Sequence, residues 1–440
     1  MLVDLHAQVD LRSLGRDLAR RGAGKRERRA AVIEGLESLA GRSQRSLRPF
    51  LGAERRAGRV RSWSGFAVVN RLLVEATPEG VAALSRRPEV AAIVPETEPS
   101  AAVLAAAPPA GKTSWALPAI GAPAAWERGL DGTGVVVGII DSGASSLHEQ
   151  LAPGFRGGAD SWLDPHGGSP EPRDTLTGHG TGVLSVAVGR SAGGVSLGVA
   201  PGAWWIACAG LPEGRYNNVL ATACADWILR VGRPDVLVIA WLLPAAGCDR
   251  SLQPLVDAWR AAEILPVFAA GNHGPGAGTD RSPANYGDLY PGGRTALSIG
   301  GLRKDGTPWP GTSQGPSGCG GAALPALSAP AEDLIAAFPI TRSSYVQADG
   351  TSFAAGIAAG VAALLLQDRP DASVADLEDA LRGGPLNVPA ALARLERTYR
   401  TVPRTGNASL GKSGSLVRMV RVPSIFPFGT LAGTMAIPIR

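Results

Sequence analysis

The chain has 440 residues, 45% hydrophobic and 18% charged, which excludes a wholly disordered protein and a single small domain. Its 58 Gly and 35 Pro follow no three-residue repeat, so a collagen-like fibre is excluded and a turn-rich globular fold is favoured. The net charge of +5 combines +6 over residues 1–100, −8 over 101–396 and +7 over 397–440. The basic ends lack basic motifs interleaved with aromatic residues, so we expect no nucleic-acid partner. We expect instead that oppositely charged parts of the chain dock on one another.

Residues 1–100 are predicted to form a small α+β domain. Apolar residues at spacings of three and four predict helices, and short apolar runs predict strands. The predicted helices and strands cover residues 11–18, 32–39, 64–70 and 90–94. Thr77 is placed to cap a further helix that has Pro78 as its first residue.

Residues 115–396 are predicted to alternate between strands and helices. Uninterrupted apolar, β-branched runs are typical of strands buried on both faces of a parallel sheet. Such runs are Val135–Ile140, Val236–Ile239 and Leu265–Ala270, and residues 252–262 are helix-like between the last two. The sequence therefore predicts an α/β fold with a central parallel sheet, preceded by the α+β domain.

Two segments have a composition that differs from these domains. Residues 101–114 belong to an Ala/Pro-rich stretch that is typical of a linker, and residues 397–440 form a basic C-terminal extension of unknown role. The longest uncharged apolar runs, Ala354–Gln367 and Ile425–Ile439, are too short to cross a bilayer. We therefore expect no membrane span.

The cysteines and the first residues bear on the compartment. The four cysteines have no spacing typical of a metal site, and their even number permits disulfides. Free buried thiols are the expectation for Cys208, Cys224, Cys248 and Cys319. The first 29 residues lack the apolar core of a secretory signal, so no visible segment directs export.

Three Gly-framed motifs each carry one reactive side chain where a strand or turn meets a helix. Asp141 ends a strand in GIIDSG, His179 begins a helix in TGHGTG, and Ser352 begins another in DGTSFAAG. Each has a simpler explanation by itself: a turn-forming Asp, an incidental His or a capping Ser. Together they favour a catalytic triad, because a serine hydroxyl needs a histidine to take its proton and a carboxylate to orient that histidine.

A fourth motif supplies the remaining group that acyl transfer needs. Residues 266–274 have the sequence PVFAAGNHG, in which a predicted strand is followed by Asn272. The Asn272 amide and the Ser352 N–H are suited to form an oxyanion hole for a tetrahedral intermediate. One such donor stabilises the transition state by roughly 3–4 kcal/mol.

These four motifs resemble those of the subtilisin-like serine proteases, the subtilases. The resemblance covers about residues 115–395 and extends to the segments GVAPGA, SPANY and SQGPS. The segments WIAC, GNHGP and PANY look most like the bacillopeptidase F branch of the family. The resemblance implies a three-layer subtilisin-like fold and a serine endopeptidase that acts on proteins or peptides and requires no cofactor.

The beginning of the chain also resembles a part of these proteases. SGFAVVN and ATPEGVAALSRRPEVAAIVPE are similar to segments of their inhibitory prodomain. The resemblance implies a zymogen whose prodomain packs on the enzyme, with an autoprocessing site in the linker 101–114. It also implies a secreted or extracytoplasmic location, which the lack of a visible signal leaves open. The substrate-binding residues it implies are Ala240, Trp241, Leu242, Ala269, Ala270 and Gly271.

Several residues depart from the family pattern, among them Ala331 and Ile357, and two departures bear most on the site. Leu242 stands where the family has Gly and predicts a narrowed pocket for a small P1 residue. Gly356 stands where the family has Pro and predicts a looser first turn in the helix of the nucleophile. Two alternatives remain: a subtilase-shaped binding protein with weak or no activity, and a maturation protease dedicated to one substrate. Structural calcium, frequent in the family, lacks a dense ligand motif here, since three candidate acids are isolated: Asp160, Asp164 and Asp174.

Overall fold

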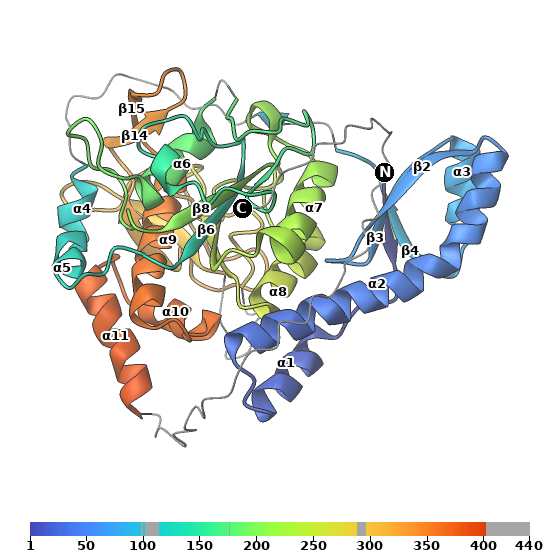
Figure 1. The fold of residues 1–440 in the computed structure, drawn as a ribbon, viewed down its shortest axis with the longest axis horizontal. Helices are drawn as coiled ribbons and strands as arrows, with labels where there is room; N and C mark the ends of the chain where they lie inside the picture. The colour runs from blue at the N-terminus through green and yellow to red at the C-terminus, as the bar shows by residue number, and fades with distance from the viewer. Residues whose placement is uncertain (98–99, 102–113, 176, 288–295, 402–440) are drawn as a thin grey trace, which may run out of the picture. The chain divides into compact units, whose positions relative to one another are not determined.

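A computed structural model describes residues 1–97, 100–101, 114–175, 177–287 and 296–401. The chain divides into one compact unit, Met1–Tyr399, and a second unit, Arg400–Arg440. The second unit from residue 402 onward, with most of the predicted basic extension, lies outside the described residues, and so does most of the predicted linker. We call residues 1–97 the N-terminal region and residues 114–401 the sheet region (Figure 1).

An antiparallel four-stranded sheet with the order β2-β3-β1-β4 organises the N-terminal region. Its elements are β1 (Leu2–Leu5), α1 (Leu11–Arg20), α2 (Lys25–Arg56), β2 (Val60–Phe66), β3 (Arg71–Ala76), α3 (Pro78–Leu84) and β4 (Val90–Val94). Thr77 caps α3 by accepting a hydrogen bond from the Gly80 N–H, as predicted. The predicted α+β character of this region is confirmed.

The strand predicted over residues 64–70 is wrong in its second half. β2 ends at Phe66, and a turn follows it. The cause lies far away in the sequence, because the Ala67 and Val68 amides donate to Asp226 Oδ1 of the sheet region at 2.8 and 2.9 Å. The apolar pattern of a segment does not show that a distant carboxylate binds its amides.

Seven parallel strands form the central sheet of the sheet region, in the order β13-β12-β11-β10-β6-β8-β7. They are β6 (Val136–Asp141), β7 (Trp162–Leu163), β8 (Trp204–Ala209), β10 (Val236–Ile239), β11 (Leu265–Ala269), β12 (Ser298–Leu302) and β13 (Leu327–Pro330). Every residue of β10 and β11 is buried. The predicted parallel sheet is confirmed, and β10 has the predicted bounds.

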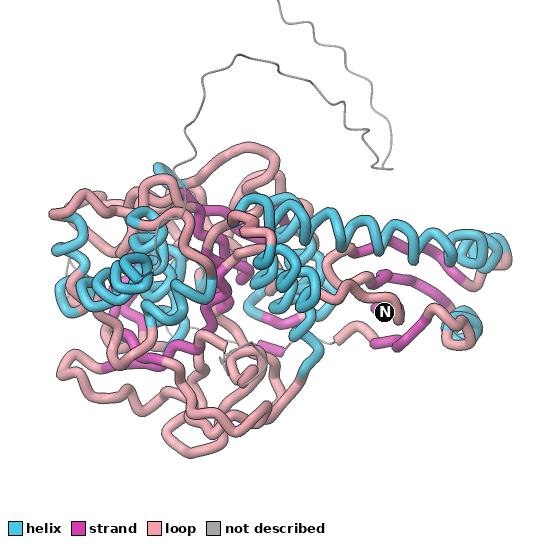
Figure 2. The backbone as a smooth tube through the Cα atoms, turned by 90° about the horizontal axis from the view of Figure 1, so that it is seen from below, coloured by secondary structure: helices cyan, strands magenta, loops and turns pink. Residues whose placement is uncertain are grey.

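Helices cover both faces of this sheet, as Figures 1 and 2 show. The main ones are α6 (His179–Val188), α7 (Asn218–Trp227), α8 (Gln253–Ala261) and α9 (Thr351–Asp368). In β10, Val236 and Val238 lie in the core that contains α6 and α9, while Leu237 and Ile239 lie in the core that contains α7 and α8. Because side chains alternate along a strand, the sheet region has three layers.

The remaining elements border this core. They are β5 (Ser100–Ala101), α4 (Ala116–Ala119), α5 (Ala122–Trp126), β9 (Arg215–Tyr216), β14 (Leu334–Phe338), β15 (Ser344–Ala348), α10 (Val374–Leu381), α11 (Val388–Thr401), three 3-10 turns (Ala152–Gly154, Pro212–Gly214 and Arg250–Leu252) and one π turn (Ile228–Gly232). β14 and β15 pair as an antiparallel hairpin, and α11 continues past residue 396.

Of the helices in the described residues, α9 is long and apolar enough to cross a membrane by length and composition. However, 89% of it is buried inside the protein, where it packs against the sheet and α6. A central helix of a three-layer fold needs this apolar composition, so α9 supports no membrane span.

The expectation of free thiols is wrong, because all four cysteines form disulfides. Cys208 on β8 is bonded to Cys224 on α7, and both are buried. Cys248 is bonded to Cys319 and joins two loops. The partners are 16 and 71 residues apart in the sequence, and the fold brings their Cα atoms to 5.7 and 4.8 Å.

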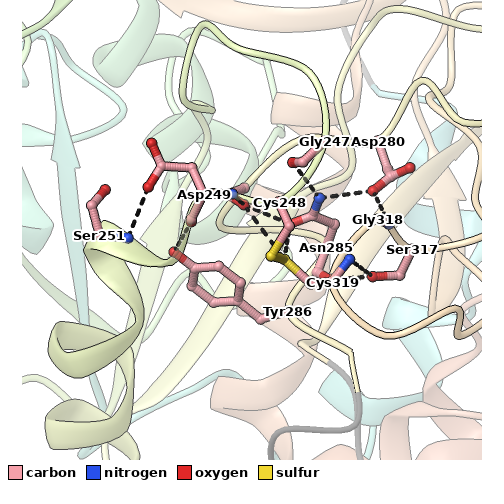
Figure 3. The surroundings of a disulfide bond; sticks show 11 residues. Gly247, Cys248, Asp249, Ser251, Asp280, Asn285, Tyr286, Ser317, Gly318 and Cys319 are labelled. Carbon is pink, nitrogen blue, oxygen red and sulfur yellow. Dashed lines mark hydrogen bonds between the residues drawn. A yellow bond between two sulfur atoms is a disulfide. The ribbon is translucent and has the colours of Figure 1, made fainter.

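The second disulfide lies in a buried polar cluster (Figure 3). Asp280 Oδ2 accepts hydrogen bonds from Asn285 Nδ2 at 2.7 Å and from the Gly318 N–H at 2.9 Å. The Leu243 N–H donates to Ser282 O at 2.7 Å. These bonds tie the loop around Ser282 both to the disulfide and to the segment that follows β10.

Candidate active site

Asp141 and His179 are in contact at the carboxyl end of β6, an inner strand of the central sheet. Asp141 is the last residue of β6, at the carboxyl end of the strand, where open α/β sheets place functional residues. His179 begins α6 after Gly178, which has a φ of 61°. His179 Nδ1 lies 2.7 Å from Asp141 Oδ1, and Asp141 is 1% exposed. A buried carboxylate thus fixes the orientation of the imidazole.

The surroundings of His179 favour its protonated form. Burial lowers its pKa, but the charges of Asp141 and Asp174 and the hydrogen bond to Asp141 outweigh burial, so the pKa lies above its ordinary value. Asp141 Oδ2 is buried and has no hydrogen-bond partner in the described part of the chain. The site is therefore suited to receive a proton on the imidazole.

A second carboxylate, Asp174, lies behind this pair. Ser142 Oγ donates to Asp174 Oδ1 at 2.7 Å and lies 3.2 Å from Asp141 Oδ1. Thr181 donates to Asp174 Oδ2 through its N–H at 2.7 Å and its hydroxyl at 2.6 Å. Burial raises the pKa of Asp174, the bonds from Thr181 and Ser142 oppose that shift, and the charge of Asp141 adds to it. Asp174 thus links the Asp141 loop to the first turn of α6.

Ser352 is the second residue of α9 and is 7% exposed. Its N–H is one of the first in the helix, and such groups have no partner within the helix. Its hydroxyl donates to Ala240 O at 3.0 Å, and no hydrogen bond joins it to His179 within the described residues. The hydroxyl must therefore leave Ala240 before it can donate to His179, and such bonds often tighten only when substrate binds.

Thr351 fixes the amide of Asn272. The Thr351 N–H and hydroxyl donate to Asn272 Oδ1 at 3.0 and 2.8 Å, and the Thr351 hydroxyl accepts from the Gly271 N–H at 3.0 Å. Because Oδ1 accepts both bonds, Nδ2 is directed away from Thr351. Asn272 is an exposed residue, so the Nδ2 donor is accessible to a bound ligand.

The six predicted substrate-binding residues come from two adjacent strands. Residues 240–242 directly follow β10, Ala269 is the last residue of β11, and residues 270–271 follow β11. Trp241 donates to Ile140 O at 2.8 Å, and its ring lies against that of Tyr216 at a tilt of 36°, with ring centroids 5.5 Å apart. Leu242 lies over Gly271, because a Cβ added to Gly271 would be 2.5 Å from Leu242 Cδ1. Leu242 therefore fills space between the two segments.

Gly356 has a packing role that the sequence did not reveal. A Cβ at this position would lie 2.5 Å from Val183 O and 2.9 Å from Val186 Cγ2. One turn later, a Cβ at Gly360 would lie 2.7 Å from Ala187 O. Glycine at both positions lets α9 approach the backbone of α6. The looser turn expected from Gly356 stays a prediction.

Comparison with known proteins assigns the chain to a family. The family model Peptidase_S8, described as the subtilase family, matches residues 132–384, which is more than half of the chain. The chain belongs to the subtilase family. Its members are serine peptidases, and the three-layer sheet region has the fold that the resemblance implied.

Individual subtilases are similar to the chain at moderate identity. Bacillopeptidase F of Bacillus subtilis (strain 168) is 31% identical in a match that covers 81% of this chain and 26% of that protein. M-protease of Shouchella clausii (strain KSM-K16) is 30% identical, covering 72% of this chain and 74% of its own length. Subtilisin Savinase of Lederbergia lenta is 31% identical, covering 61% and 89%. The chain thus spans about a quarter of bacillopeptidase F and most of the other two.

The structure of this subtilase adds residues to the site that the motifs did not single out. Ser142 and Thr351 are direct neighbours of Asp141 and Ser352, so inspection of the motif flanks could have found them. Asp174 was considered only as an isolated acid for calcium. Its link to Asp141 depends on a loop conformation for which the sequence has no signal.

The end of the N-terminal region and the short strand after it lie next to the site. This strand, β5, pairs with β9 in antiparallel register, with Ser100 opposite Tyr216. Just before it, Asn218 Nδ2 donates to Pro95 O at 2.9 Å, and Asn218 Oδ1 accepts from the Thr97 N–H at 3.2 Å. Since the Tyr216 ring contacts the Trp241 ring, this segment borders the predicted substrate-binding residues 240–242.

The acids considered for calcium have other partners. The carboxylate of Asp164 accepts hydrogen bonds from three N–H groups of its own loop, and Asp160 pairs with Arg156. In the described ranges, no group of three or more His, Cys, Asp or Glu side chains is arranged to hold a metal ion. These residues do not fit a calcium site, and no step below uses a metal.

Proposed function

We propose that this subtilase is a serine endopeptidase with Ser352 as nucleophile, His179 as general base and then general acid, and Asp141 as the residue that orients His179. Ser352 Oγ attacks the carbonyl carbon of the scissile bond while His179 Nε2 takes the hydroxyl proton. His179 then gives that proton to the leaving amine, and the C–N bond breaks. A water that His179 deprotonates hydrolyses the acyl-enzyme and restores Ser352.

The electrostatics of the site support this order of proton transfers. The negative charges of Asp141 and Asp174 stabilise the imidazolium that forms when Ser352 attacks. The tetrahedral oxyanion would be bound by Asn272 Nδ2 and the Ser352 N–H, the donors left free by Thr351 and by the start of α9.

The substrate would bind as an added strand along residues 240–242. The two walls that flank its P1 side chain would be residues 240–242 and 269–271. The position of Leu242 over Gly271 supports a preference for a small P1 residue, because the Leu242 side chain occupies space that a larger P1 side chain would need.

The N-terminal region would act as an inhibitory prodomain, with processing in the linker 101–114. Three residues of α7 support this role, because they lie on one face at spacings of four and all bind the N-terminal region. Asn218 binds the segment at Thr97, Thr222 accepts from Arg71 Nη1 at 3.1 Å, and Asp226 accepts from two amides after β2.

The 2.7 Å contact between His179 and Asp141 beside the start of α9 carries the proposal. It is tested by mass spectrometry of purified wild type and Ser352→Ala, together with a serine-directed fluorophosphonate label. We expect cleavage within residues 101–114 and labelling in wild type alone. Labelling without cleavage would retain the peptidase and reject self-processing.

A second candidate is a subtilase-shaped binding protein. Two observations favour it: the Ser352 hydroxyl is bonded to Ala240 O, and Leu242 fills space beside Gly271. The same label distinguishes the two functions, because wild type that reacts no better than Ser352→Ala would support the binding protein.

A further inference from the structure

Helix α2 contributes to two separate hydrophobic cores. Val32, Ile33 and Leu36, in its first half, are 0–6% exposed and lie in the core built on α7 and α8. Leu47 and Leu51, in its second half, are fully buried in the core of the N-terminal region itself. Figure 1 shows α2 as one long helix that begins beside α8. We call residues 11–38, which comprise α1 and the first half of α2, the helical arm.

Arg29 of the helical arm is bound by backbone carbonyls of two loops in the sheet region. Its guanidinium donates to four oxygens at 3.0–3.1 Å, and three of its nitrogens take part. The acceptors are the carbonyl oxygens of Arg233, Pro234, Ala262 and Glu263. Burial lowers the pKa of Arg29, which the charge of Asp235 opposes. Such a planar, largely buried donor set is typical of an interface anchor.

Ion pairs surround this anchor. Lys25 Nζ lies 3.2 Å from Asp235 Oδ1, and Arg28 Nη1 lies 3.0 Å from Glu263 Oε1. Farther along the arm, Glu37 pairs with Arg230 at 2.7 Å, with the signs reversed. The arm therefore meets the sheet region through charge complementarity as well as apolar packing.

The helical arm binds near the amino ends of β10 and β11, whereas the candidate active site lies at the carboxyl ends of the strands. Asp235 directly precedes β10, and Glu263 lies two residues before β11. Ala240 and Asn272, in contrast, follow the carboxyl ends of the same two strands. Contacts of the arm with the two loops therefore do not require that residues 95–101 be bound beside the candidate active site.

We propose that the helical arm is a second anchor, which holds the N-terminal region on the sheet region independently of residues 95–101 beside the candidate active site. This inference rests on the proposed zymogen function only for its biological meaning. After a cut in the linker, the N-terminal region stays bound through Arg29 and its surrounding ion pairs. The lifetime of the inhibited state is then set by the contacts of the arm as well as by those of residues 95–101.

The test uses the full chain with Ser352→Ala and a recognition sequence for an unrelated, site-specific protease inserted between Ala107 and Pro108. The chain is immobilised through its C-terminal end and cut by the added protease. Release of the N-terminal region into buffer is then followed over time. No outcome depends on activity of the chain itself, so failure of the anchor and failure of the proposed peptidase are measured separately.

Arg29→Ala should speed release at least about 30-fold, the size expected for a buried interface anchor. Arg26→Ala is the matched control, because Arg26 is an exposed arginine one turn earlier on α2, and its release rate should stay within about twofold of that of the parent chain. High salt should speed release of the parent chain by screening the ion pairs, and should do so less in Lys25→Ala/Arg28→Ala.

Thermal unfolding of the uncut chain shows whether each variant folds. Should Arg29→Ala fail to fold, Arg29→Lys keeps the charge but cannot reach the same carbonyls, so release should still be faster than in the parent chain. Release of Arg29→Ala or Arg29→Lys at the parent rate would overturn the proposal. So would loss of the parent's N-terminal region as soon as the linker is cut.

Discussion

Strands β10 and β11 have different surroundings at their two ends. At the carboxyl ends, the Ala240 carbonyl oxygen accepts one hydrogen bond, from the Ser352 hydroxyl, and Asn272 is an exposed residue with an amide donor. At the amino ends, the carbonyls of the preceding loops are bound by Arg29. The carboxyl ends of these two buried strands thus present accessible polar groups that suit chemistry. At their amino ends, the carbonyl groups already accept hydrogen bonds from the N-terminal region. Substitutions at the carboxyl ends should therefore not change how tightly the N-terminal region binds. Substitutions at the amino ends should not change peptidase activity.

The largest effect on activity is expected from a substitution at the carboxyl ends of the strands. Ser352→Ala removes the proposed nucleophile, and kcat for a peptide substrate should fall by at least about 10⁴-fold. If the two ends of the strands act independently, the N-terminal region of Ser352→Ala is still released slowly after the linker is cut. Activity within tenfold of wild type would show that another residue is the nucleophile.

Asn272→Ala should have the next largest effect. Loss of its amide donor should lower kcat by about 10²–10³-fold. This range is the one known for a donor of this kind in a subtilisin, a member of the same family. KM should change little, because the donor binds the oxyanion rather than the substrate carbonyl. A rise in KM with an unchanged kcat would instead place Asn272 in ground-state binding.

Leu242→Gly should alter specificity more than rate. Opening the space over Gly271 should raise kcat/KM for substrates with a large apolar P1 residue by about 10- to 100-fold relative to an Ala P1 substrate. A peptide library measured with wild type and variant gives this ratio. An unchanged ratio, or a wild type that already prefers bulky aromatic P1 residues, would contradict the assignment of Leu242.

The smallest effect is expected from Asp174→Asn and concerns pH. Burial lowers the pKa of His179, but Asp141 and Asp174 raise it above its ordinary value, and catalysis requires the neutral imidazole. Removal of the Asp174 charge should lower the pKa of His179, so the acid limb of the kcat/KM profile should move to lower pH. Asp164→Asn, in the same loop region, should leave the profile in place. A shift to higher pH would contradict the role of Asp174.

Local sequence patterns were sufficient where the cause of a structure is itself local. The apolar run Val236–Ile239 has the bounds of β10, and Thr77 caps α3 as its position before Pro78 predicted. The Gly-framed motifs also placed Asp141, His179 and Ser352 at the ends of elements. The reason is that apolar periodicity and capping act between residues within a few positions of each other.

Other features were decided by contacts between distant residues. β2 ends early because Asp226 binds the next amides, and the cysteines pair because the fold brings their Cα atoms together. Asp174 and Arg29 were inconspicuous in the sequence, as an isolated acid and one arginine among many. Their partners lie across loops and across the two regions of the chain.

The sequence by itself therefore determined the fold class, several of the helices and strands, and the candidate triad. The tertiary structure alone decided which groups surround that triad and which residues hold the N-terminal region. The physical reason is that hydrogen bonds, ion pairs and disulfides depend on distances of a few ångströms between side chains, and these distances are set only when the whole chain has folded.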